Sequence, residues 1–167
     1  KLVDSSAQVL KDCEPKYWEK SIEIFEMFMD DFDSEVVDAY GHSFLWLPKE
    51  RFSLLLPTIK KYAELMANKK VSSYYYEYLL SGVRQYPKDC LELVEHFDKY
   101  QEPSISEGSY YDKEVIQIIL SVYNVLFEED AEQNHDYLAK SIAIFDRILQ
   151  NDTFRSTSDM VLRAVEN

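Results

Sequence analysis

KEVIQIILSVYNVLF, residues 113–127, is the stretch that decides the fold class of this chain. Within residues 115–127, polar side chains interrupt the apolar ones only at Gln117, Ser121 and Asn124. A helix that is apolar on nearly every side is normally packed between neighbouring elements. The stretch also falls short of the roughly 18 apolar residues that a membrane span needs. It therefore predicts a helical domain of several packed elements, with no membrane partner.

The rest of the chain repeats helical spacing. Trp18, Ile22, Phe25 and Met29 step by four and three residues, which is the spacing of one helix face. Further stripes of this kind are Phe52, Leu55, Leu56, Ile59, Ala63 and Met66; Tyr75, Tyr76, Leu79, Leu80 and Val83; Cys90, Leu91, Val94 and Phe97; and Leu138, Ile142, Phe145 and Leu149. The chain holds only 3 glycines and 5 prolines, too few for the tight turns of a sandwich or barrel. We predict an all-α fold, an irregular right-handed α-solenoid or bundle of about seven to nine helices in antiparallel hairpins.

Proline and polar residues mark the expected boundaries. Pro15, Pro48 and Pro87 each suit the first turn of a helix. Pro57 interrupts an apolar stripe, so we expect a kink or split near Ser53, whose carbonyl loses its donor. Residues 101–110 are the best loop candidate, and a weak sub-boundary is expected near residues 68–72. We interpret residues 1–167 as a single helical domain and as a fragment of a larger protein.

Negative charge is concentrated in one part of the chain. The net charge is −13, and residues 88–136 hold 3 basic and 13 acidic residues. Such a field repels phosphate backbones, so we expect no nucleic-acid partner. It favours a basic protein partner, although the same charge also serves solubility alone.

Sequence patterns for catalysis and metal binding are absent. No phosphate-binding glycine loop and no HExxH pattern occur, and the three histidines lie on separate segments. A calcium loop counted from Asp31 would place Val36 at the required glycine and His42 at the required glutamate. Cys13 and Cys90 are far apart and belong to no CxxC pair, which suits a reducing cytoplasm. We predict a chain that is not an enzyme and uses no metal and no cofactor.

A family resemblance covers roughly residues 72–167. The run YPKDCLEL, residues 86–93, resembles the tyrosine-proline and leucine-rich helix starts of degenerate HEAT-like repeats. Residues 138–146, with Leu149 and a closing helix over residues 155–165, are similar to the ends of such arrays in large bacterial multidomain ATPases, including antiviral NACHT- or STAND-type sensors. The resemblance implies a sensor or scaffold arm, with nucleotide chemistry on another domain.

Two groups of side chains are candidate partner-binding residues. Tyr74 and Tyr78 lie on a helix that also carries Tyr75 and Tyr76, so at least one of them should point away from a single buried face. Exposed aromatic residues, with Trp46 as a further candidate, are good interface anchors. The second group is the acidic face Glu92, Glu95 and Asp98. Our hypothesis is a protein-interaction or scaffold domain, and the alternative is a helical domain that binds a small molecule or peptide in an aromatic pocket.

Overall fold

The computed structural model describes residues 2–29, 34–66, 71–98 and 113–151. All regular secondary structure in these ranges is helical, which confirms the all-α prediction. The chain divides into two compact units, Lys1–Gly82 and Val83–Asn167, here called unit 1 and unit 2. The expected loop at 101–110, the expected closing helix at 155–165 and most of the expected sub-boundary near 68–72 lie outside the described residues.

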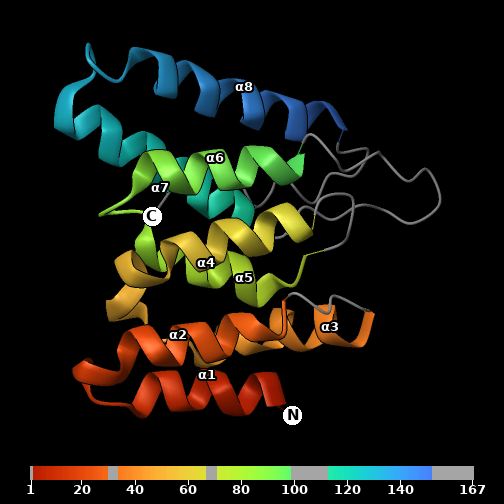
Figure 1. Ribbon diagram of the computed structural model, residues 1–167. Helices are drawn as coiled ribbons and strands as arrows, with labels where there is room; N and C mark the ends of the chain where they lie inside the picture. Colours follow the sequence, from red (N-terminus) through yellow and green to blue (C-terminus); the bar gives the residue numbers. More distant parts are fainter. Residues whose placement is uncertain (1, 30–33, 67–70, 99–112, 152–167) are drawn as a thin grey trace. The chain divides into compact units, whose positions relative to one another are not determined.

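Unit 1 contains five α-helices and three 3-10 turns in its described part (Figure 1). They are α1 (Leu2–Asp12), η1 (Pro15–Tyr17), α2 (Trp18–Met27), α3 (Ser34–Ser43), η2 (Phe44–Trp46), η3 (Lys49–Arg51), α4 (Phe52–Leu65) and α5 (Ser73–Gly82). Helix α1 packs against α2 and α3, whereas α5 packs against α3, α4 and both turns η2 and η3. Helix α5 therefore has neighbours on more than one side.

Prolines shape the helix starts of unit 1. Pro15 begins the turn that leads into α2, as the sequence predicts. Pro57 lies inside α4 without ending it. The chain instead changes from 3-10 turn to α-helix at Phe52, directly before Ser53, whose carbonyl has no donor from Pro57. Helix α4 therefore begins one residue before Ser53, the residue whose carbonyl cannot accept an N–H from Pro57.

The core of unit 1 is built largely from aromatic rings. Phe44 lies at its centre, with ring centroids 4.9 Å from Tyr62 and 5.0 Å from Tyr75 in edge-to-face geometry. Phe52 stacks on Tyr78 at 5.5 Å. Such arrangements add favourable ring-to-ring electrostatics to the burial of apolar area. The side chains of all five residues are buried.

Gly82 allows close packing around this aromatic core. A Cβ atom at Gly82 would fall 2.3 Å from Cζ of Phe52, which is far inside van der Waals contact. The glycine ends α5 at the point where the Phe52 ring occupies the space that a side chain would need. Its small size is therefore a packing requirement of unit 1.

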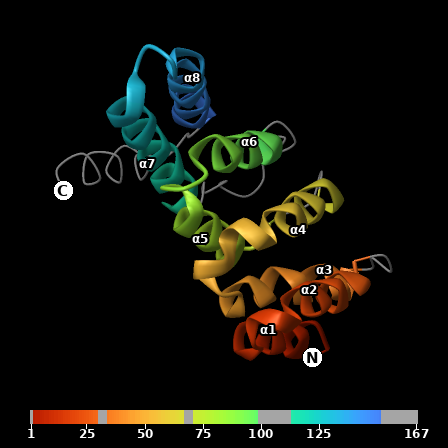
Figure 2. The same ribbon diagram turned by 60° about the vertical axis from the view of Figure 1, so that its left-hand side comes forward.

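Unit 2 has three described helices, α6 (Pro87–Asp98), α7 (Lys113–Asp130) and α8 (His135–Asn151) (Figure 2). Helix α7 packs against both α6 and α8, which confirms the prediction for residues 113–127. Its buried side chains are Val115, Ile116, Ile118, Ile119, Val122 and Leu126. None of the helices within the described ranges has the length and apolar content that a bilayer crossing requires.

The buried face of α8 differs from the predicted stripe. Ser141, Ile144 and Ile148 are buried, whereas Ile142 is 50% exposed. Apolar residues in this helix fill two overlapping faces, so spacing alone does not select one of them. Ser141 fits the buried face because its hydroxyl donates to the Tyr137 carbonyl, at 2.9 Å. The prediction of Ile142 as a core residue is wrong.

Candidate functional site

The structure corrects the role expected of Tyr78. Its side chain is buried, its ring stacks on Phe52, and its hydroxyl donates to the Pro48 carbonyl at 3.0 Å. Burial raises the pKa of Tyr78 well above its usual range. The prediction assumed an outer helix with one buried face, whereas α5 packs against α3, α4, η2 and η3. Tyr78 is therefore a core residue and presents no exposed anchor.

Tyr74 and Trp46 occupy less buried positions in unit 1. Tyr74 is half-buried, and its ring lies 5.7 Å from the ring of His42. Trp46 is 39% exposed and follows Leu45, which is 51% exposed. Tyr75 of α5 packs against the core rings of Phe44 and Tyr62.

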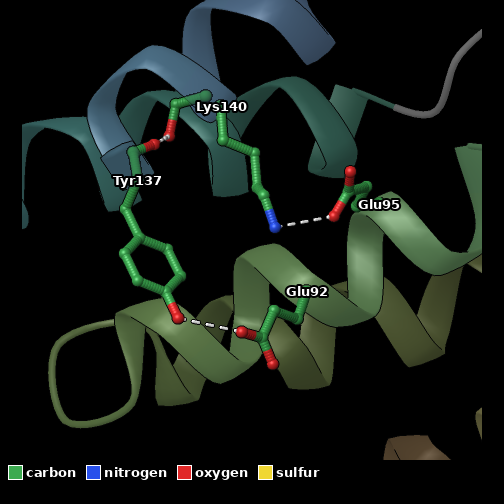
Figure 3. Close-up of polar contacts among 5 residues, drawn as sticks. Glu92, Glu95, Tyr137 and Lys140 are labelled. Carbon is green, nitrogen blue, oxygen red and sulfur yellow. Dashed lines mark hydrogen bonds and ion pairs between the residues drawn. The ribbon is translucent and has the colours of Figure 1, made fainter. Parts of the chain in front are cut away.

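The predicted acidic residues of α6 face α8 (Figure 3). Glu92 accepts a hydrogen bond from the Tyr137 hydroxyl at 3.0 Å, and Glu95 forms an ion pair with Lys140 at 2.9 Å. Glu92 and Glu95 are three residues apart on α6, and Tyr137 and Lys140 are three residues apart on α8. The two acceptors therefore share one helix face, and so do the two donors. The side chain of Asp98 lies outside the described residues. The structure thus joins two of the three predicted carboxylates to α8.

Cations surround the ring of Tyr137 in this α6–α8 cluster. The Nζ atom of Lys88 lies 5.0 Å from the ring centroid and that of Lys140 lies 5.7 Å away. The pKa of Tyr137 is raised, mainly by its hydrogen bond to Glu92 and secondly by partial burial. The hydrogen bond to Glu95 raises the pKa of Lys140. Tyr137 and Lys140 therefore stay protonated at neutral pH and act as donors to the two carboxylates of α6.

Sequence reasoning did not find Tyr137 and Lys140. The available signal was the matching spacing of three residues on α6 and α8, with acceptors on one helix and donors on the other. That signal becomes specific only when the two helices are known to be neighbours.

The connection between α7 and α8 is a second acidic surface. Its exposed carboxylates are Glu128, Glu129, Asp130, Glu132 and Asp136. No lysine or arginine occurs between Glu114 and Ala139 in the sequence, and the one histidine of this segment, His135, has a ring nitrogen 3.5 Å from a carboxylate oxygen of Asp136. In the part of the chain that the structure describes, no group of three or more His, Cys, Asp or Glu side chains is arranged to hold a metal ion.

Hydrogen bonds fix this connection. One carboxylate oxygen of Asp130 accepts the backbone N–H groups of Glu132 and Gln133, both at 3.0 Å. The buried amide of Asn134 donates to the Leu126 carbonyl, also at 3.0 Å. These bonds satisfy backbone groups at the end of one helix and the start of the next. The acidic surface is therefore held on an ordered turn.

The two cysteines occupy different environments. The Cys13 thiol is half-buried and lies 3.4 Å from the Ser21 hydroxyl and 3.8 Å from an Arg51 nitrogen. Arg51 also donates to the carbonyl of Cys13 at 3.2 Å, which places it at the end of α1. Cys90 is buried, and its burial raises the pKa of the thiol to about 12. Neither cysteine takes part in a disulfide bond.

Comparison with known proteins places the chain in no family. A scan against protein-family models found no match, and searches of curated proteins and of solved structures found no similar chain. The resemblance to HEAT-like arrays therefore stays a prediction from the sequence.

Proposed function

We propose that this chain is a non-catalytic interaction or scaffold domain, built from helical hairpins, that binds a basic protein partner. The exposed carboxylates at the α7–α8 connection are the observation that carries this proposal. They stand on an ordered turn, and the segment between Glu114 and Ala139 supplies no lysine or arginine to neutralise them. A surface of one charge sign attracts a partner of the opposite sign and accelerates their association.

The contacts between α6 and α8 make the acidic face of α6 a less favourable binding surface than the sequence suggested. Glu92 and Glu95 already bind Tyr137 and Lys140, so a partner would have to compete with these contacts. Among the carboxylates at the α7–α8 connection, Asp130 holds the turn and Asp136 lies 3.5 Å from a ring nitrogen of His135, whereas Glu128, Glu129 and Glu132 are exposed. We therefore propose the α7–α8 connection as the principal contact and the α6 face as a secondary one.

The finer architecture is also part of the proposal. We propose an irregular right-handed solenoid of the HEAT-like kind that serves as a sensor or scaffold arm in a cytoplasmic antiviral ATPase. Its support is that the helices of each unit pack against helices one or two places away in chain order, as in α1–α2, α1–α3 and α3–α5, which is how solenoid repeats bury their cores. Nucleotide chemistry would then lie on another domain, and nucleic acid would be no partner.

Affinity capture with charge-matched variants tests the proposal. The full chain is immobilised, proteins are captured from native lysate, and the captured set is measured as salt concentration rises. The test variant Glu128→Gln/Glu129→Gln/Glu132→Gln removes three charges from the α7–α8 connection and leaves Asp130 in place. The control variant Glu19→Gln/Glu50→Gln/Glu64→Gln removes three exposed charges from unit 1.

The proposal predicts a captured partner that is basic and whose retention falls as salt rises, because salt screens exposed charges. The test variant should lose this partner, whereas the control variant should keep it. Equal retention by the two variants would show that the α7–α8 connection is not the contact. Capture that does not respond to salt would contradict a charge-driven interaction.

A further inference from the structure

An exposed aromatic pair lies on α7 next to the acidic connection. Phe127 is 56% exposed, although α7 is otherwise the most apolar helix of unit 2. Its ring stacks on the half-buried ring of Tyr123, with centroids 6.0 Å apart and planes inclined by 10°. The two residues are four apart, so they lie one above the other on the same helix face. Phe127 is thus the more exposed member of this pair.

Ile142 provides a reference for this exposure. Within the described part of unit 2, Phe127 and Ile142 are the large apolar side chains with the greatest exposure, at 56% and 50%. Ile142 is on α8 and is followed in sequence by the exposed Ala143. Phe127 is followed directly by Glu128, Glu129 and Asp130, all exposed. Similar exposure thus occurs in two different electrostatic settings.

We propose that Phe127 and Tyr123, with the carboxylates of the α7–α8 connection, form a docking surface for a basic protein segment that carries an aromatic or long aliphatic anchor. The inference rests on the proposed function and specifies its surface and the chemistry of its partner. The aromatic pair supplies apolar area for the anchor. The exposed carboxylates of Glu128 and Glu132 receive lysine or arginine side chains that flank the anchor.

Charge complementarity selects this occupant over a second copy of the chain. Two copies that met at this surface would bring their exposed carboxylates together, and like charges at an interface disfavour association. A basic segment neutralises the same carboxylates. Its arginine or lysine side chains also gain attraction from the face of an aromatic ring such as Phe127.

The preformed geometry of the connection supports binding without a large conformational change. Asp130 and Asn134 hold the turn through hydrogen bonds to the backbone of residues 126–133. The stacked Tyr123 ring restricts the orientation of the Phe127 ring. Groups that are ordered before binding lose less conformational freedom when a partner docks.

Selection from a random peptide library displayed on phage tests the inference on the full chain. Enriched peptides are synthesised, and their affinities are measured for the unmodified chain, for Phe127→Ser and for the matched variant Ile142→Ser. Thermal unfolding of each variant shows whether it is folded. We expect enriched peptides to combine lysine or arginine with an aromatic or long aliphatic residue. Phe127→Ser should weaken their binding by at least about tenfold, the size of effect typical of an interface anchor, whereas Ile142→Ser should leave it nearly unchanged.

Three results would overturn the inference. The first is enrichment of peptides without basic residues. The second is equal affinity of the unmodified chain and the folded Phe127→Ser variant for the enriched peptides. The third is a concentration-dependent increase in mass of the unmodified chain that Phe127→Ser abolishes, because it would identify a second copy as the occupant. Loss of peptide binding in Glu128→Gln/Glu129→Gln/Glu132→Gln with full binding in Phe127→Ser would leave the proposed function intact and refute only the aromatic anchor. Capture of a partner that does not respond to salt would refute the proposed function itself.

Discussion

Unit 1 and unit 2 use their aromatic residues in opposite ways. In unit 1, Phe44, Tyr62 and Tyr75 are buried and contact one another at the centre of the core. In unit 2, the buried face of α7 is aliphatic, and Phe127 is exposed. The two units also differ in net charge. Residues 1–82 hold 10 basic and 14 acidic residues, whereas residues 83–167 hold 8 basic and 17 acidic residues. In unit 1 buried aromatic residues form the core, whereas among the described residues of unit 2 the exposed ring of Phe127 marks a candidate surface.

Truncation of a core ring gives the largest expected effect in this comparison. Phe52→Ala should reduce the free energy of unfolding by about 3–5 kcal/mol, because it leaves a cavity beside Tyr78. Trp46→Ala, at a position that is 39% exposed, should cost clearly less. Urea unfolding followed by circular dichroism measures both. Equal losses would contradict the division of unit 1 into an aromatic core and an exposed Trp46.

Overpacking of the same core should have the next largest effect. Gly82→Ala places a methyl group within 2.3 Å of the Phe52 ring and should cost about 1–3 kcal/mol of unfolding free energy. Phe52→Leu in the same chain should recover part of that loss, because it removes the ring atoms that clash. A double-mutant cycle measures the coupling. Additive losses would show that Gly82 and Phe52 do not share this space.

Alkaline pH should affect unit 2 through Cys90. The folded pKa of Cys90 is about 12, compared with an ordinary value of 9.0. A raised folded pKa contributes stability that is fully present below pH 9 and is lost as pH rises toward 12. Urea unfolding of the unmodified chain should therefore show a steeper loss of stability above pH 9 than Cys90→Ala shows. Parallel pH profiles would indicate that the thiol is not buried as described.

The ion pair between α6 and α8 should have the smallest effect. Lys140→Met should lower the free energy of unfolding by up to about 1 kcal/mol, since the pair is only partly shielded from solvent. Lys20→Met, which removes a fully local pair with Glu23 on α2, is the matched control and should cost less. Thermal unfolding at low and high salt measures both. A larger effect in the control would contradict a role for Lys140 in joining the two helices.

Helix periodicity predicted the all-α fold, and proline position predicted the start of α6 at Pro87, because both are local properties of the sequence. It identified the sandwiched position of α7 because that helix is apolar on nearly every side. It did not identify the buried face of α8, where two apolar faces overlap, or the burial of Tyr78, which depends on the neighbours of α5. The contact of Glu92 with Tyr137 also arises only when two distant segments pack together.

Amide chemical-shift mapping by NMR tests the central claim most directly. The full chain is titrated with a short synthetic peptide of lysines around one phenylalanine, and the shift of each backbone amide is followed. We predict that the largest changes fall on residues 123–136 of unit 2 and that residues 72–82 of unit 1 change little. Changes centred on the tyrosine helix α5, or no saturable changes at residues 123–136, would contradict the account.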